Sequence, residues 1–403
     1  MAEIISERKN MKLRIELAKM DLSDLRKPAQ ILDFAKDAND QEFTLLQLDA
    51  DVLKVIENGG NLIIRGNEDD SAVLCTDDST YNIKRALTSN KMLLIPECTR
   101  EKEQMPELFS SGKDEEIVPL HRDVVGWSSE YLELKRIHPQ TTRLVDLLKQ
   151  NYYKGPQHEQ DDGQKSYTLS ELLEEVQASE VEVMTYLCKL NACCVDGRWR
   201  LLDFGYLVDC MGELFQLIDS ESWSCGSVPF IEATQKINDS GELVPTFILK
   251  HLLGSYGSQI PTNDGIVCYA IDEAKVCRLF AEMLLRDVQK FNLSEFLDVW
   301  KYSVPAGMVT NEKYLLGLAL VDKCSNPHTV KLFKVDQLPL DMDARFNALF
   351  DVKEKWTFEQ IEPYIEDVCI KGQTVSAMLT KYARASNLNG VKVYSTRKSG
   401  SKS

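Results

Sequence analysis

Residues 141–203 read TTRLVDLLKQNYYKGPQHEQDDGQKSYTLSELLEEVQASEVEVMTYLCKLNACCVDGRWRLLD, and the fold prediction starts from them. Near their end, Asp196-Gly197 separates two short runs that contain apolar residues. Asp-Gly at such a place predicts a β-hairpin, because a type I′ turn needs positive φ at both central residues.

Helical signals come before this hairpin. Residues 141–150 carry leucines at helical spacing, which predicts a first helix. Two capping boxes each open a further helix; the pairs are Thr168 with Glu171 and Ser179 with Glu182. Residues 152–166, between the first and second helices, are polar and rich in glycine, which indicates a loop. Three helices followed by a two-stranded wing predict a winged helix-turn-helix domain over 141–203.

The pattern recurs along the chain at a period of about 60 to 70 residues, which is typical of tandem small domains. It is expected over 204–271 with a weak wing, and again over 272–338 and 339–396; 204–338 is treated as one winged-helix region with two patterns. Third helices are predicted at 311–318 and 375–385. The weak second pattern is either degenerate or merged with its neighbour, so three or four domains remain possible.

The first 96 residues form a separate β-rich block. A helix is predicted at 51–58, and strands are predicted at 43–48, 61–65, 72–76, 80–85 and 91–95. The block is small for an independent core, so a small barrel completed by partner chains and a self-sufficient barrel are both open. Residues 1–38 show some helical pattern, and residues 15–18 fit a first strand equally well. The apolar side chains proposed to face partners are Phe43, Leu45, Leu62, Ile64, Val73, Tyr81 and Leu93.

Residues 97–140 are assigned as a linker and packing segment, and 397–403 as a basic tail. The predicted fold class is therefore α+β: an N-terminal β-barrel-type domain, completed by partner chains, followed by tandem winged-helix domains.

Composition excludes several classes of protein. The 403 residues are 43% hydrophobic, as in ordinary globular proteins, and no apolar run approaches the length of a membrane span. The 11 cysteines include no CxxC pair and the five histidines show no metal spacing, so reduced, mostly buried thiols are expected and no metal site. No phosphate-binding loop, nucleophile elbow or zinc-protease motif occurs. Cys188 and Cys193 have no suggestive histidine, so no catalytic or cofactor site is predicted.

The net charge of −16 disfavours DNA binding over the whole surface. No acidic residue follows Asp367, however, and six basic residues there are predicted to contact DNA: Lys371, Lys381, Arg384, Lys392, Arg397 and Lys398. In a winged helix the third helix and the wing usually meet nucleic acid. The matching helix of 141–203 carries Glu180 and Glu182, which repel phosphate. The alternative is a solvated basic face with a disordered tail.

Several short segments carry a family resemblance in the same order along the chain. They are SAVLCT at 71–76, DSESWS at 219–224, VPAGMV at 304–309, GLALVD at 317–322 and GVKVY at 390–394. Together they resemble the DCC family of sister chromatid cohesion proteins.

The resemblance implies a non-catalytic subunit of the alternative, replication factor C-like clamp loader for chromosome transmission fidelity. Its N-terminal block is then expected to join the small partner subunit and the tail of the large ATPase subunit in a composite barrel. Its winged helices are expected to bind single- and double-stranded DNA and to dock the catalytic subunit of DNA polymerase epsilon. The sliding clamp (PCNA) is an indirect partner, no membrane is involved, and a nuclear location is implied.

Two other functions stay open from the residues alone. One is a stand-alone winged-helix DNA-binding regulator, which the negative net charge disfavours. The other is a cullin-like scaffold, for which the sequence offers no decisive mark. An enzyme is the least favoured class, because no catalytic constellation is present.

Overall fold

A computed structural model describes residues 13–14, 16–19, 30–40, 42–68, 70–98, 120–159, 165–240, 244–261, 266–323, 325–369, 372–388 and 390–397. The chain divides into two compact units. The first unit comprises residues 1–54 and 83–135, and the second comprises 55–82 and 136–403. Among the described residues the fold is α+β with several small sheets, none of which closes into a barrel.

Long strands dominate the first unit. β1 (Gln30–Asn39) runs parallel to β6 (Leu120–Arg136), and so does the two-residue β2 (Leu46–Gln47). β5 (Thr80–Leu94) is the other neighbour of β6, which leaves β1 at the edge of the sheet. The separate strands expected at 80–85 and 91–95 are thus one continuous strand, a correction that follows from pairing along β6. There Thr88 Oγ1 donates to the carbonyl of Asn90 at 2.6 Å and lies 3.1 Å from that of Ser129.

The N-terminal region differs from the expectations in two further places. Residues 13–14 and 16–17 are helical, which favours helix over strand there. β6 occupies most of the segment assigned as linker and packing, and residues 99–119 lie outside the described part of the chain. The helix expected at 51–58 is confirmed as α2 (Ala50–Glu57).

The second unit begins with a short meander of strands. β3 (Ile63–Arg65) pairs antiparallel with β4 (Val73–Cys75), which pairs with the first residues of β5. Its contacts with the following helices are specific. Ser179 N donates to the hydroxyl of buried Thr80 at 3.0 Å, and Thr80 Oγ1 donates to Glu182 at 2.5 Å. The Gln177 amide donates to the Ser71 carbonyl at 2.7 Å. The meander is therefore fastened onto the helices that follow it.

Module A (residues 142–201) has the predicted order of elements. It contains α3 (Thr142–Leu148), α4 (Leu169–Glu175), α5 (Glu180–Lys189), β7 (Ala192–Val195) and β8 (Arg198–Leu201). Both capping boxes are confirmed, with each N-cap hydroxyl and each N3 carboxylate satisfying a backbone N–H. Asp196 and Gly197 have φ of 50° and 79°, as the predicted turn requires. A one-turn 3₁₀ helix, Pro156–His158, lies in the segment expected to be a loop.

Module B (residues 204–271) contains a complete hairpin. Its elements are α6 (Phe204–Ser220), β9 (Val228–Pro229), α7 (Phe230–Ser240), α8 (Thr246–Ser255), β10 (Gly257–Ile260) and β11 (Cys268–Ile271). The expectation of a degenerate wing is wrong, because β10 and β11 pair over four residues each. β10 is largely polar and exposed, so its sequence lacks the alternation of apolar and polar residues that predicts a half-buried strand.

Module C (residues 273–332) departs from prediction in its third helix. It contains α9 (Glu273–Arg286), β12 (Phe291–Asn292), α10 (Leu293–Ser303), β13 (Ala319–Asp322) and β14 (Thr329–Leu332). The helix expected at 311–318 is only a 3₁₀ turn, Glu312–Leu315, and Leu316 is already extended. A second 3₁₀ turn, Val335–Gln337, connects to the last module.

Module D (residues 342–396) ends the described chain. It contains α11 (Met342–Val352), β15 (Trp356–Thr357), α12 (Phe358–Ile361), the 3₁₀ turns Glu362–Tyr364 and Glu366–Val368, α13 (Val375–Tyr382), β16 (Ala383–Leu388) and β17 (Val391–Thr396). Thr357 and Gln360 form a capping box at the start of α12. The helix expected over 375–385 stops at Tyr382, so Arg384 lies on a strand.

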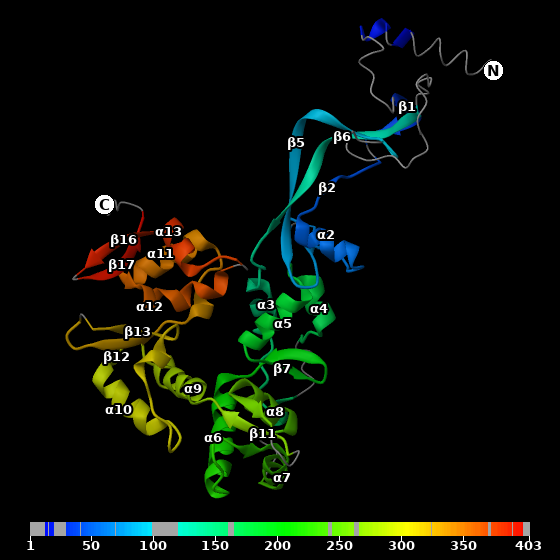
Figure 1. Cartoon of the computed structure of the whole chain (residues 1–403). Coiled ribbons are helices and arrows are strands. Elements are labelled where there is room, and N and C mark those ends of the chain that lie inside the picture. The colour runs from blue at the N-terminus through cyan, green and yellow to red at the C-terminus, as the bar shows by residue number, and fades with distance from the viewer. Residues whose placement is uncertain are drawn as a thin grey trace. The chain divides into compact units, whose positions relative to one another are not determined.

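The four modules, coloured from green to red along the chain in Figure 1, have a common strand-pairing pattern. In B, C and D, a two-residue strand before the second helix pairs with the last strand of the hairpin. In A, a single bridge between Tyr167 and Trp199 takes the same place. Each module has its own buried cluster, and the cluster of B also includes Tyr153 and Val276 from its neighbours. The chain thus repeats the unit four times.

Candidate nucleic-acid interface and other candidate sites

The basic surface of module D is built at the junction of α13 with the final hairpin. Thr374 caps α13 by accepting from Ala377 N, so the helix begins there and brings Lys381 into its last turn. Arg384 follows on β16, Lys392 on β17, and Arg397 just after β17. The structure therefore brings these four predicted DNA contacts together on neighbouring elements, whereas Lys371 and Lys398 lie outside the described residues.

These four side chains are exposed, and within the described ranges none of them forms an ion pair with a carboxylate. Their contacts are of other kinds. The Lys381 ammonium lies 4.8 Å from the centre of the Tyr382 ring, and that of Lys392 lies 5.4 Å from the Tyr394 ring. Arg397 donates to the carbonyl of Lys381. The hydrogen bond with Tyr382 raises the pKa of Lys381, so this lysine is charged at neutral pH. The surface presents uncompensated positive charge.

The corresponding helix of module A, α5, presents the opposite charge. Glu180 is exposed beside a shallow depression whose floor includes Val181, Met184 and Cys188. Glu182 is engaged, because its carboxylate accepts from the hydroxyls of Thr80 and Ser179. That any DNA contact belongs to module D and not to module A stays a prediction.

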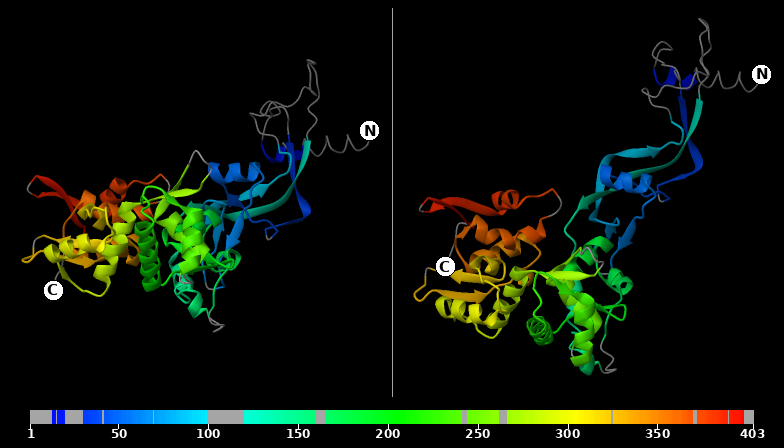
Figure 2. Two further views of the ribbon diagram at one scale, coloured as in Figure 1. Left: turned by 90° about the horizontal axis from the view of Figure 1, so that it is seen from below. Right: turned by 60° about the horizontal axis from the view of Figure 1, so that its bottom comes forward.

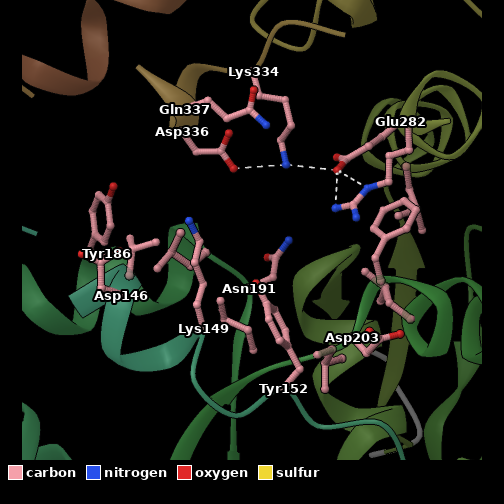
Figure 3. Close-up of a pocket in the computed structure, with 18 of the residues that line it drawn as sticks. Asp146, Lys149, Tyr152, Tyr186, Asn191, Asp203, Glu282, Lys334, Asp336 and Gln337 are labelled. Carbon is pink, nitrogen blue, oxygen red and sulfur yellow. Dashed lines mark hydrogen bonds and ion pairs between the residues drawn. The ribbon is translucent and has the colours of Figure 1, made fainter. Parts of the chain in front are cut away.

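A cavity of about 930 Å³ lies among modules A, B and C and the connector after β14 (Figure 3). On one wall Lys334 lies between two carboxylates, 3.1 Å from Glu282 and 3.1 Å from Asp336. Glu282 also pairs with Arg286 at 2.9 Å. Asp146 and Lys149 stand on the facing wall. On the first wall, Lys334 is thus held between two carboxylates, one of which it shares with Arg286.

Of the two cysteines considered as nucleophiles, Cys188 is exposed on α5 and Cys193 is buried on β7. Burial raises the pKa of Cys193 to about 12, so its thiol is protonated and inert at neutral pH. No group of three or more metal-ligating side chains occurs among the described residues. The ring of His251, which lines the cavity, donates from Nε2 to the Asn191 carbonyl at 3.1 Å, and desolvation lowers the pKa of His251.

The predicted partner-facing residues divide into two groups. Val73 and Tyr81 are buried within this chain and are not available to a partner, because they pack in the β3–β4–β5 meander. Phe43, Ile64 and Leu93 are exposed, and Leu45 and Leu62 are half-buried.

Sequence reasoning missed other exposed apolar side chains of the first unit. Leu32 and Phe34 lie on the edge strand β1, and Phe34 meets the Trp127 ring edge-on at 5.6 Å. Leu87 on β5 is 79% exposed. The sequence signal for β1 is weak, because the apolar residues of ILDFAK at 31–36 occur in adjacent pairs and do not alternate with polar ones.

The family model described as "Sister chromatid cohesion protein Dcc1" matches residues 43–365. The human sister chromatid cohesion protein DCC1 is 43% identical over 95% of this chain and 96% of its own length. The zebrafish (Danio rerio) protein of that name is 42% identical over 95% and 96%. The Saccharomyces cerevisiae protein is 23% identical over 89% and 97%. No helix in the described part of the chain is long and apolar enough to cross a membrane.

Proposed function

The chain belongs to the Dcc1 family of sister chromatid cohesion proteins, and we propose that it serves cohesion as a non-catalytic subunit of the alternative, replication factor C-like clamp loader. Family membership supports the role in sister chromatid cohesion. The proposal adds that the first unit joins the small and large loader subunits, while the modules of the second unit contact DNA and DNA polymerase epsilon. The sliding clamp is then an indirect partner, and the nucleus is the expected location.

We assign the four modules to the winged-helix class. The order of helix, short strand, two helices and hairpin supports this assignment in B and D. Module A has the same order with a single bridge in place of the short strand, and in module C a 3₁₀ turn takes the place of the third helix. Helix-turn-helix domains read DNA with the third helix or the wing. A module whose third helix is acidic suits protein docking instead, so module A is proposed to face the polymerase.

The observation that carries the DNA proposal is the unpaired basic surface of module D. Lys381, Arg384, Lys392 and Arg397 gather on one helix end and one hairpin of a chain whose net charge is −16. Exposed cations without carboxylate partners are free to neutralise phosphates and release counterions. A basic face that is only solvated would not account for this local excess of positive charge.

The partner proposal for the first unit rests on its open sheet. The edge strand β1 presents Leu32 and Phe34, and β5 presents Leu87. An exposed apolar edge strand is a place where another chain adds a strand. Partner strands paired there would complete the composite barrel and cover this apolar surface.

The DNA proposal is tested by measuring affinity for duplex DNA against salt concentration with the full chain. The variant Lys381→Glu/Arg384→Glu/Lys392→Glu should bind more weakly and with a flatter dependence on salt, by about one unit of slope for each phosphate that is no longer neutralised. Lys301→Glu, a reversal on exposed α10 of module C, is the matched control. An unchanged slope in the triple variant would rule out module D as the DNA surface.

A further inference from the structure

The tip of the β16–β17 hairpin carries two exposed apolar side chains. Leu388 and Val391 face one another directly across the hairpin and are 45% and 51% exposed. The hairpin extends beyond the helices of its own module in each view (Figure 2), and residues 384–388 of β16 are all exposed. About half of the surface of each of these two side chains is therefore left uncovered by the chain.

The other three hairpins are built differently at the same place. In module A the last pair is Val195 with Arg198, and Val195 is buried. In module B it is Ile260 with buried Cys268. In module C the pair is polar and joins Asp322 to Thr329. Only module D, which is also the basic module, exposes an apolar pair at the hairpin end among the described residues.

We propose that Leu388 and Val391 form a wedge that enters the minor groove of duplex DNA and unstacks a base step. The inference rests on the DNA contact proposed for module D and specifies what its hairpin does there. Proteins that distort the minor groove insert leucine, isoleucine or similar side chains between bases, flanked by basic residues. An apolar pair flanked by cations matches that chemistry.

Strand geometry places a cation where the wedge needs it. Successive side chains of a strand alternate, so Arg384 lies on the same face as Leu388. Arg384 precedes Leu388 by four residues, which is about 13 Å along the strand and exceeds the minor-groove depth of about 7.5 Å. With the tip at the groove floor, the backbone of Arg384 therefore lies beyond the rim, and its long side chain can reach back to the phosphates there. Lys392 lies on the opposite face and meets the other wall.

The width of the groove explains why insertion distorts the duplex. Paired strands lie about 4.8 Å apart before side chains are added, whereas the minor groove of B-DNA is only about 6 Å wide. The hairpin fits only when the groove opens. Opening the groove separates neighbouring bases, and the apolar tip fills the space that forms between them.

The test follows base stacking with 2-aminopurine, whose fluorescence rises when it unstacks. The full chain is added to short duplexes that carry the probe at successive positions, and binding is measured in parallel by anisotropy. The wild-type chain should raise the fluorescence at one or two adjacent positions. Leu388→Ser/Val391→Ser should lose that rise while keeping the salt slope of binding, because no charge has been removed.

Two further variants serve as controls. Leu388→Phe keeps an apolar wedge and should retain the rise. Val309→Ser removes an exposed apolar side chain from module C and should leave both signals unchanged. Circular dichroism of each variant checks folding, and the serine variants replace only exposed side chains.

The outcomes distinguish failure of the wedge from failure of the DNA contact proposed for module D. If the wild-type chain binds duplex DNA without any rise, or if the serine variant keeps the rise, the wedge is refuted while the DNA contact stands. If the wild-type chain fails to bind duplex DNA, the DNA contact of module D fails and the wedge fails with it.

Discussion

Arg345 and Asp367 form an ion pair inside module D, with Nη2 2.6 Å from Oδ1 and no exposed area on the arginine side chain. The guanidinium also donates to the carbonyls of Tyr364 at 2.6 Å and Pro339 at 3.0 Å. One side chain thus ties α11 to the 3₁₀ turns that precede the basic helix. Burial lowers the pKa of Arg345, but the carboxylate beside it keeps the guanidinium charged.

Arg345→Met is expected to lower the free energy of unfolding by about 3–5 kcal/mol, because Asp367 loses its partner in a largely desolvated place. The measurement is urea denaturation followed by circular dichroism. Adding Asp367→Asn to Arg345→Met should recover part of the loss, since the unpaired charge disappears. Lys355→Ala, on an exposed residue of the same module, is the control. A loss equal to that of the control would show that the pair is not structural.

Thr80 fastens the strand meander to module A. Its buried hydroxyl donates to Glu182 and accepts from Ser179 N. Thr80→Val keeps the shape and removes both bonds, so the second unit should lose about 1–3 kcal/mol of unfolding free energy. Thr380→Val removes an exposed hydroxyl that bonds within α13 and should cost much less. Equal effects of the two changes in thermal denaturation would contradict this role.

The turn of module A provides a test of backbone strain alone. Gly197 has φ of 79°, and a Cβ built there meets nothing within 4 Å. Gly197→Ala should therefore destabilise the chain by about 1–2 kcal/mol through the left-handed backbone only. Gly212 also has open space but lies inside helix α6, so Gly212→Ala should stabilise by up to about 1 kcal/mol. If Gly197→Ala and Gly212→Ala shift the melting temperature in the same direction, the assignment of the turn is contradicted.

His251, which lines the cavity, makes the free energy of unfolding depend on pH. Desolvation lowers its pKa below the ordinary 6.5, so the unfolded chain binds this proton more readily than the folded chain. The stability contributed by neutral His251 is complete above pH 6.5 and is lost as the pH falls through the folded pKa. His251→Gln should make the unfolding free energy less sensitive to pH in this window. His328→Gln, at an exposed site, is the control, and an identical pH profile for His251→Gln and the wild type would refute this role of His251.

Local signals predicted local structure well. The capping boxes at Thr168 and Ser179 and the Asp196-Gly197 turn are confirmed, because each depends on residues within four positions. Strand continuity depends on distant partners instead. β5 runs unbroken because β6 pairs along it, and the polar β10 is a strand because β11 lies opposite. No short window of sequence contains that information.

The candidate DNA-binding site likewise combines features that are visible in the sequence with features that depend on the fold. The excess of basic residues after Asp367 is visible in the sequence, but Arg384 was expected on a helix and lies on β16. The exposure of Leu388 and Val391 depends on how far the hairpin extends beyond its module, which composition does not reveal. Likewise the burial of Val73 and Tyr81, which the sequence predicts to face a partner, depends on the pairing of strands in the meander.

The chain is proposed to bridge the clamp loader and DNA through different surfaces, and one co-purification decides whether it does. The full chain is expressed with the small and large loader subunits, as wild type and as Leu32→Asp/Phe34→Asp on the edge strand β1. We expect the wild-type chain to capture both subunits, whereas the variant loses them yet binds duplex DNA with the wild-type salt slope. Capture that is undiminished in the variant, or absent with the wild type, would refute the bridge.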